Sequence, residues 1–199
     1  MTITIFFDYF QKNWIELSGT ILSLVYLYFS IKENVLLWIF GFLCSALYIV
    51  VFFDSKFYAD MSLQVYYLAV SVYGWISWHK KDNRDTSPLH ITKLNRRELQ
   101  NLSLYLIAIY FVYFVVLRFF TDSPIPIMDS LVGALSVIGT WLLAKKKIEN
   151  WILWIVADAL AAGLFAYKKL YPTSILFIIY TTMAIVGYLR WKATMRART

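Results

Sequence analysis

Hydrophobic residues in this chain are gathered into seven long stretches, which shorter polar segments separate. The stretches cover residues 14–31, 35–53, 59–78, 101–120, 128–144, 151–167 and 172–191. A helix needs roughly 17 to 25 apolar residues to cross the hydrocarbon core of a bilayer. Each of these stretches, 17 to 20 residues long, is therefore long enough with little to spare. The pattern predicts an all-α membrane protein with seven transmembrane helices.

The composition supports this class and excludes others. Of the 199 residues 60% are hydrophobic and 16% are charged, whereas soluble domains are about half apolar and about a quarter charged. The single cysteine, Cys44, excludes a disulfide framework, and the two histidines, His79 and His90, lack the spacing of metal ligands. We therefore expect no metal, no cofactor and no enzymatic centre. The net charge of +7 is typical of basic cytoplasmic loops and does not point to nucleic acid.

The basic residues are distributed unequally between the two sides of the predicted membrane. If seven helices cross it, 14 of the 19 lysines and arginines fall on the side that holds the polar loop 80–100 and the tail 192–199. Because cytoplasmic loops carry the excess of basic residues, this split predicts a cytoplasmic C-terminus and an N-terminus outside. Residues 1–13 lack the pattern of a cleaved signal peptide and are expected to be an extracytoplasmic segment of the mature protein.

The last three hydrophobic stretches resemble the first three. At a shift of 113 in the numbering, matched pairs are Glu16 and Asp129, Tyr58 and Tyr171, Tyr67 and Tyr180, Gly74 and Gly187, and Trp78 and Trp191. At a shift of 116, Glu33-Asn34 matches Glu149-Asn150, and Leu37-Trp38-Ile39 matches Leu153-Trp154-Ile155. The change of shift predicts a longer loop before the sixth stretch and makes Trp38 the counterpart of Trp154.

This repeat predicts the architecture. If a three-helix unit were followed directly by its copy, the copy would have the opposite orientation in the membrane. One additional helix between them gives both units the same orientation. We expect two parallel three-helix bundles, residues 14–79 and 121–191, joined by the basic cytoplasmic loop 80–100 and the linker helix 101–120, an arrangement abbreviated 3+1+3. In transporters built from parallel repeats, the substrate site lies near the middle of the bilayer.

The strongest candidate site is in the sixth stretch, around Asp158. Trp151, Trp154 and Asp158 are spaced i, i+3 and i+7, which places them on one side of a helix, and no other charge occurs in 151–167. A carboxylate inside the bilayer is costly unless it is paired or hydrated, and indole faces attract cations. The pattern predicts a site for a flat, cationic molecule, although Trp154 could be a packing residue and Trp151 an interfacial anchor.

Further candidates come from the third stretch and from the repeat. Gln64 and Tyr67 lie on a polar-aromatic face of the third helix, and a buried primary amide needs a hydrogen-bonding partner. Trp38 and Tyr180 join the expected substrate-binding set, Trp38 as a stacking partner and Tyr180 as the counterpart of Tyr67 in the repeat. Glu16 and Asp129 open the first helix of each repeat, where they either stabilise the helix start or attract cations.

Several stretches resemble the Pnu-type family (PnuC/PnuT) of bacterial vitamin transporters. They are Trp14-Ile15-Glu16 with Gly19, Ala59-Asp60 with Leu63-Gln64, Tyr73-Gly74-Trp75 with Trp78, Asp129, and Glu149-Asn150-Trp151 with Trp154. The resemblance covers nearly the whole chain. It implies a SWEET-like fold, a homotrimer in the bacterial inner (plasma) membrane, and facilitated diffusion of a vitamin that a cytoplasmic vitamin kinase traps by phosphorylation.

The resemblance leaves the transported vitamin open. Members that carry nicotinamide riboside resemble one another in having asparagine at the positions of Asp158 and Cys44. An asparagine offers both a donor and an acceptor, which suits a carboxamide, whereas a carboxylate suits an amino-substituted ring with a fixed cation. We therefore expect thiamine uptake, with nicotinamide riboside, which is also cationic, as the alternative. A non-transporting membrane receptor or assembly protein is the alternative of another class.

Overall fold

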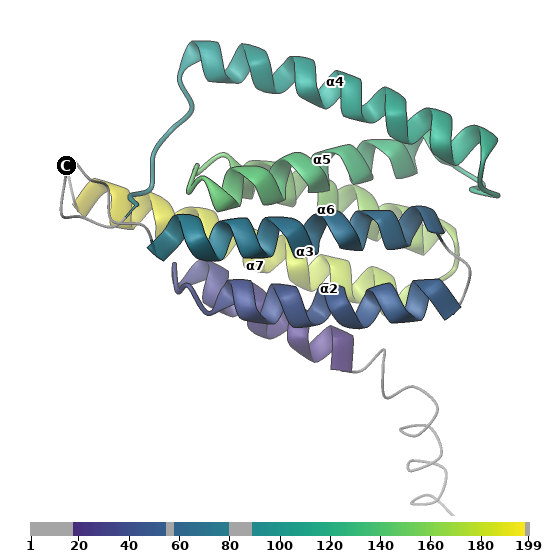
Figure 1. The fold of residues 1–199 in the computed structure, drawn as a ribbon, viewed down its shortest axis with the longest axis horizontal. Coiled ribbons are helices and arrows are strands. Elements are labelled where there is room, and N and C mark those ends of the chain that lie inside the picture. The colour runs from purple at the N-terminus through teal and green to yellow at the C-terminus, as the bar shows by residue number, and fades with distance from the viewer. Residues whose placement is uncertain (1–17, 55–57, 80–88, 198–199) are drawn as a thin grey trace, which may run out of the picture. The chain divides into compact units, whose positions relative to one another are not determined.

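The computed structural model describes residues 18–54, 58–79 and 89–197. Within them the chain forms seven helices (Figure 1). These are the helix Ser18–Ile31, α2 (Leu37–Asp54), α3 (Tyr58–His79), α4 (Arg96–Phe119), α5 (Pro126–Ala144), α6 (Asn150–Tyr167) and α7 (Tyr171–Ala197). The predicted all-α fold is confirmed. The arrangement as two parallel bundles and the predicted domain boundaries remain predictions.

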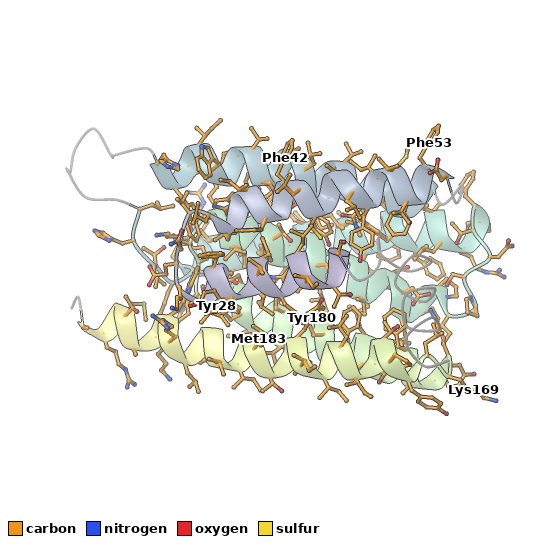
Figure 2. The ribbon with its side chains drawn as sticks, turned by 90° about the horizontal axis from the view of Figure 1, so that it is seen from below. Tyr28, Phe42, Phe53, Lys169, Tyr180 and Met183 are labelled. Atoms are coloured by element: carbon orange, nitrogen blue, oxygen red, sulfur yellow. The ribbon has the colours of Figure 1, made fainter. Side chains whose placement is uncertain are left out.

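Five of these helices, α2 and α4 to α7, are long and apolar enough to cross a membrane. The helix Ser18–Ile31 is apolar but shorter within the described residues. The 22-residue α3 contains tyrosines, serines and Gln64, which lower its hydropathy. Large apolar side chains such as Phe42 and Phe53 on α2 are exposed at the protein surface (Figure 2). A bilayer would cover such side chains.

Three helices differ in their ends from the hydrophobic stretches that predicted them. α4 begins at Arg96 because Asn95 caps it and Glu98 completes a capping box, so a polar first turn precedes the apolar part. α5 begins at Pro126, a residue suited to the first helical position. α7 continues to Ala197, so most of the predicted tail 192–199 is helical. Hydropathy alone misses polar helical turns outside the membrane.

The chain divides into two compact units, Met1–Trp75 and Ile76–Thr199. In the second unit α6 contacts both α5 and α7, and α4 contacts α5. The division falls inside α3, so Trp78 at the end of α3 belongs to the second unit. There its indole N–H donates to the carbonyl of Ala144 at 3.1 Å, and its ring contacts Trp191 at 6.4 Å.

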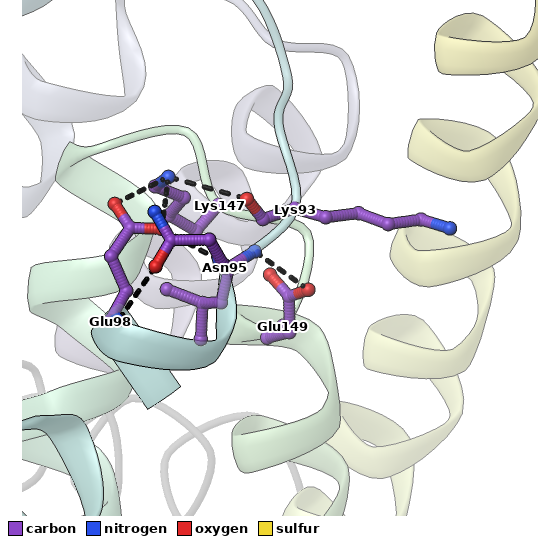
Figure 3. A network of polar contacts seen from close by, with 6 residues as sticks. Lys93, Asn95, Glu98, Lys147 and Glu149 are labelled. Atoms are coloured by element: carbon purple, nitrogen blue, oxygen red, sulfur yellow. Dashed lines mark hydrogen bonds and ion pairs between the residues drawn. The ribbon is translucent and has the colours of Figure 1, made fainter. Parts of the chain in front are cut away.

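The segment before α4 is bound to the turn between α5 and α6 (Figure 3). The backbone of Thr92 pairs with this turn. Its amide donates to the carbonyl of Lys146 at 3.1 Å, and its carbonyl accepts from the amide of Ile148 at 3.0 Å. Glu149 Oε1 accepts the Leu94 amide at 3.0 Å. Lys147 Nζ lies 2.9 Å from Glu98 Oε1. These contacts fix the start of α4 within the second unit.

The repeat continues at one constant shift of 113. Helix ends match at Ile31 and Ala144, Asp54 and Tyr167, and helix starts match at Leu37 and Asn150, Tyr58 and Tyr171. The turns between these helices also match. Glu33 has φ 55° and Lys146 has φ 50°, and each lies at the C′ position of a Schellman motif.

The hydrogen bonds of the two turns repeat in the same register. The backbone amides of Glu33 and Asn34 donate to the carbonyls of Ser30 and Phe29 at 3.1 and 3.0 Å, respectively. In the second turn, the backbone amides of Lys146 and Lys147 donate to the carbonyls of Leu143 and Leu142, both at 2.9 Å. Lys32 lies over the Tyr28 ring at 4.5 Å, as Lys145 lies over the Trp141 ring at 5.1 Å. The predicted change of shift to 116 is therefore wrong.

The corrected register changes which tryptophans are equivalent. Trp38 matches Trp151 and not Trp154. Both rings lie against a glycine: a Cβ at Gly74 would fall 2.3 Å from Trp38 Cε2, and a Cβ at Gly187 would fall 2.5 Å from Trp151 Cη2. Only glycine permits so close an approach. The identical residues Glu-Asn and Leu-Trp-Ile occur in both repeats but at positions that are not structurally equivalent. The hydrogen bonds of the two turns set the register.

Candidate functional site

Asp158 is a buried carboxylate on α6 with 6% of its surface exposed. No hydrogen bond or ion pair to it is found among the described residues. The nearest lysine in sequence, Lys168, pairs with Asp129 instead. A lone carboxylate in a membrane helix is costly, and such residues mark substrate or ion pathways. The structure therefore retains Asp158 as the leading candidate for substrate contact.

Trp154 lies one turn before Asp158, at the i−4 position on the same side of α6. Its half-buried indole covers Gly139 of α5, where an added Cβ would be 3.2 Å from both Cε2 and Nε1 of the indole. The contact packs the ring against the neighbouring helix. A carboxylate and an aromatic ring next to each other are suited to a cationic ring.

Trp151 contacts a different helix. Its ring makes an edge contact with Trp191 at 5.5 Å and covers Gly187, both of α7. The side chain is 1% exposed, and its indole N–H has no hydrogen-bond acceptor among the described residues. Trp151 and Trp154 therefore have different neighbours, although both are on the side of α6 that carries Asp158. The contacts of Trp151 are those of a packing residue, and its substrate role remains a prediction.

The candidates in the first unit are on α2 and α3. Trp38 is 1% exposed and packs on Gly74. Gln64 is half-buried, and no hydrogen bond to its amide is found in the described part of the chain. The ring of Tyr67 lies 5.6 Å from that of Tyr66, and its carbonyl accepts the Ser71 hydroxyl at 2.8 Å. Substrate contact by these three residues remains a prediction.

Tyr180, the counterpart of Tyr67, is half-buried on α7. Its ring makes an edge contact with Phe177 at 5.5 Å, and Phe177 stacks on Phe165 of α6 at 5.1 Å. The tyrosine thus belongs to an aromatic group between α6 and α7. Its contact with substrate remains a prediction.

Of the two acidic residues expected at helix starts, only Asp129 lies within the described residues. Glu16 lies outside the described residues. Asp129 is in the first turn of α5, where it accepts the Ser123 hydroxyl at 2.6 Å and both its oxygens lie 3.1 Å from Lys168 Nζ. This position fits stabilisation of the helix start. The ion pair also connects α5 to the end of α6 and compensates the charge that would attract a cation.

Ser45 is a further buried polar residue, which the spacing of charged and aromatic residues in the sequence does not single out. It is 5% exposed on α2, and no hydrogen bond to its hydroxyl is found among the described residues. At the constant shift of 113 it is the counterpart of Asp158. The register set by the turns would have found it, whereas the shift of 116 used for this part of the repeat did not.

Known proteins match this chain along most of its length. The sequence model of the nicotinamide mononucleotide transporter family matches residues 13–193. The nicotinamide riboside transporter PnuC of Escherichia coli K12 is 26% identical over 213 residues, which cover 95% of this chain and 89% of the relative. The PnuC of Neisseria mucosa is 22% identical over 196 residues, covering 93% and 74%.

One solved structure has a similar fold. The crystal structure of the vitamin B3 transporter PnuC aligns with a TM-score of 0.76 at 21% identity, covering 98% of this chain and 88% of that one. At this identity the match concerns the fold, and it agrees with the all-α prediction. Together with the family match, it confirms the resemblance to Pnu-type transporters.

Proposed function

The chain belongs to the nicotinamide mononucleotide transporter family, and we propose that it takes up nicotinamide riboside. Family membership makes it a multi-pass protein of the inner membrane and a transporter, as expected, rather than an enzyme. The observation that supports a cationic substrate is Asp158, a buried carboxylate without a protein partner in the described residues, next to the indole of Trp154.

The expectation of thiamine is not supported. The relatives are named as nicotinamide riboside transporters, which favours the alternative. The preference for thiamine depended on the carboxylate of Asp158 in place of an asparagine. A carboxylate does not distinguish the two vitamins, because the pyridinium of nicotinamide riboside is itself a fixed cation that a carboxylate attracts.

The transport cycle that we propose is facilitated diffusion by alternating access, in which a substrate site opens to one side of the membrane at a time. The sequence contains no glycine-rich phosphate-binding loop that would supply energy from a nucleotide. Accumulation beyond the outside concentration then requires that the vitamin be removed inside the cell. We propose that a cytoplasmic vitamin kinase phosphorylates it, and that the transporter works as a homotrimer.

Uptake into proteoliposomes tests this function. We expect labelled nicotinamide riboside to enter until the inner and outer concentrations are equal, and to accumulate further only when its kinase and ATP are enclosed. Uptake of thiamine but not of nicotinamide riboside would contradict the substrate. Accumulation above equilibrium in empty vesicles would contradict facilitated diffusion. Binding without any uptake would favour a receptor.

A further inference from the structure

The hydroxyl of Ser45 differs from the other buried hydroxyls for which a hydrogen bond is described. Such groups on membrane helices usually donate to a backbone carbonyl one turn earlier. Four here do so, and another donates across to a neighbouring helix: Ser71, Ser130, Ser136, Thr140 and Ser174. Ser45 is as buried as these, at 5% exposed, yet its hydroxyl has no partner in the described residues.

The repeat gives Ser45 a defined counterpart. Ser45 is the ninth residue of α2, as Asp158 is the ninth residue of α6. The two matching Schellman turns and the two tryptophan–glycine contacts place these helices in the same register. Each unit therefore holds, at the same position of its second helix, one buried polar side chain without a described protein partner.

The surroundings of Ser45 also match. On α2, Trp38, Gly41 and Ser45 are spaced i, i+3 and i+7, as Trp151, Trp154 and Asp158 are on α6. Trp38 contacts Gly74, and a Cβ at Gly41 would be 3.0 Å from Ser71 Oγ. Both contacts are with α3. Ser45 thus continues the side of α2 that packs inside the first unit, and it is not a lipid-facing serine.

From these observations we propose that Ser45 is a substrate-binding residue whose hydroxyl bonds a neutral polar group of the transported nucleoside, a sugar hydroxyl or the carboxamide. A hydroxyl that has no protein partner can form a hydrogen bond with a ligand, and a bound substrate would supply that partner. A serine can donate and accept at once, so it can bond either kind of neutral group. The inference deepens the proposed function and rests on it.

The test compares Ser45→Ala with Ser71→Ala in the full-length protein. Ser71 is a matched control because it is equally buried in the same unit, but its hydroxyl is already bonded to the Tyr67 carbonyl. We expect Ser45→Ala to weaken binding of nicotinamide riboside about 3- to 10-fold by calorimetry, the usual effect of one neutral hydrogen bond. The melting temperature should not fall, and Ser71→Ala should bind as the wild type does.

Two further variants keep the test decisive. Ser45→Cys preserves size but donates poorly, so it should bind as weakly as Ser45→Ala, whereas Ser45→Thr should recover part of the affinity. Wild-type affinity in both Ser45→Ala and Ser45→Cys would overturn the role of Ser45 and leave the proposed function intact. If the wild type does not bind nicotinamide riboside, the proposed function fails, and this inference fails with it.

Discussion

Asp158 is a charged residue whose position the stability of the fold does not explain. Its carboxylate is buried on a membrane helix and no described residue neutralises it. Folding gains nothing from such a group, since removing an unpaired buried charge usually costs no stability. A role in binding a cation explains why it is there.

Asp158→Ala should therefore lower the affinity for nicotinamide riboside about 10- to 100-fold, because interactions with a charged group are stronger than neutral ones. Calorimetry and uptake into proteoliposomes measure the change. Asp158→Asn, which keeps an acceptor and the side-chain volume, should retain more affinity. Unchanged uptake by Asp158→Ala would contradict the substrate role, and an unaltered melting temperature is the control for folding.

Gly187 is a residue whose contribution is to packing and stability and not to substrate binding. A Cβ there would fall 2.5 Å from the ring of Trp151, which is 1% exposed and has no room to move. Gly187→Ala should reduce the free energy of unfolding by about 1–3 kcal/mol, as overpacked cores do. Thermal unfolding in detergent measures this.

The control for Gly187→Ala is Gly163→Ala on α6, where nothing lies within 4 Å of the added Cβ. That variant should be neutral or slightly stabilised, since alanine favours a helix over glycine. Equal melting temperatures for the two variants would show that the contact between Trp151 and Gly187 is loose.

At the scale of elements, the start of α4 depends on its cap. The Asn95 side chain accepts the Glu98 amide at 2.8 Å, and Glu98 Oε2 accepts the Asn95 amide at 2.8 Å. Lys147 adds an ion pair to Glu98, whose side chain is 39% exposed. Exposed ion pairs contribute little, whereas a helix cap contributes about 1 kcal/mol.

Asn95→Ala should therefore lower the melting temperature by about 2–4 °C, and Lys147→Ala should lower it less. Limited proteolysis before α4 should follow the same order. A larger effect of Lys147→Ala would mean that the ion pair, and not the cap, holds this segment to the turn between α5 and α6.

At the scale of the whole molecule, the distribution of basic residues predicts that the C-terminus is cytoplasmic. The prediction is tested in a Cys44→Ser background with one new cysteine at a time, using a maleimide that does not cross membranes. Ala197→Cys, at the exposed end of α7, should react only in inverted vesicles. Asp122→Cys, in the exposed loop between α4 and α5, should react in intact spheroplasts. The reverse pattern would invert the topology.

The fold class and the family could be predicted correctly from the amino-acid sequence alone, and the repeated three-helix unit remains a prediction. The length of an apolar stretch and the positions of charges are local properties, and the bilayer translates them directly into helices and their predicted orientation. Asp158 was found for the same reason, since a charge within an apolar stretch is visible without any neighbour.

The register of the repeat and the neighbours of each tryptophan depend on how the helices pack, which the sequence pattern does not show. The hydrogen bonds of the turns set one constant shift of 113, although matching residue letters favoured 116 in the second helix. Burial of Trp151 on Gly187 and the unpartnered hydroxyl of Ser45 depend on which helices pack together. Spacing along one helix says which side a residue is on, but the adjacent helix decides whether that side is filled by a ring, a carbonyl or neither.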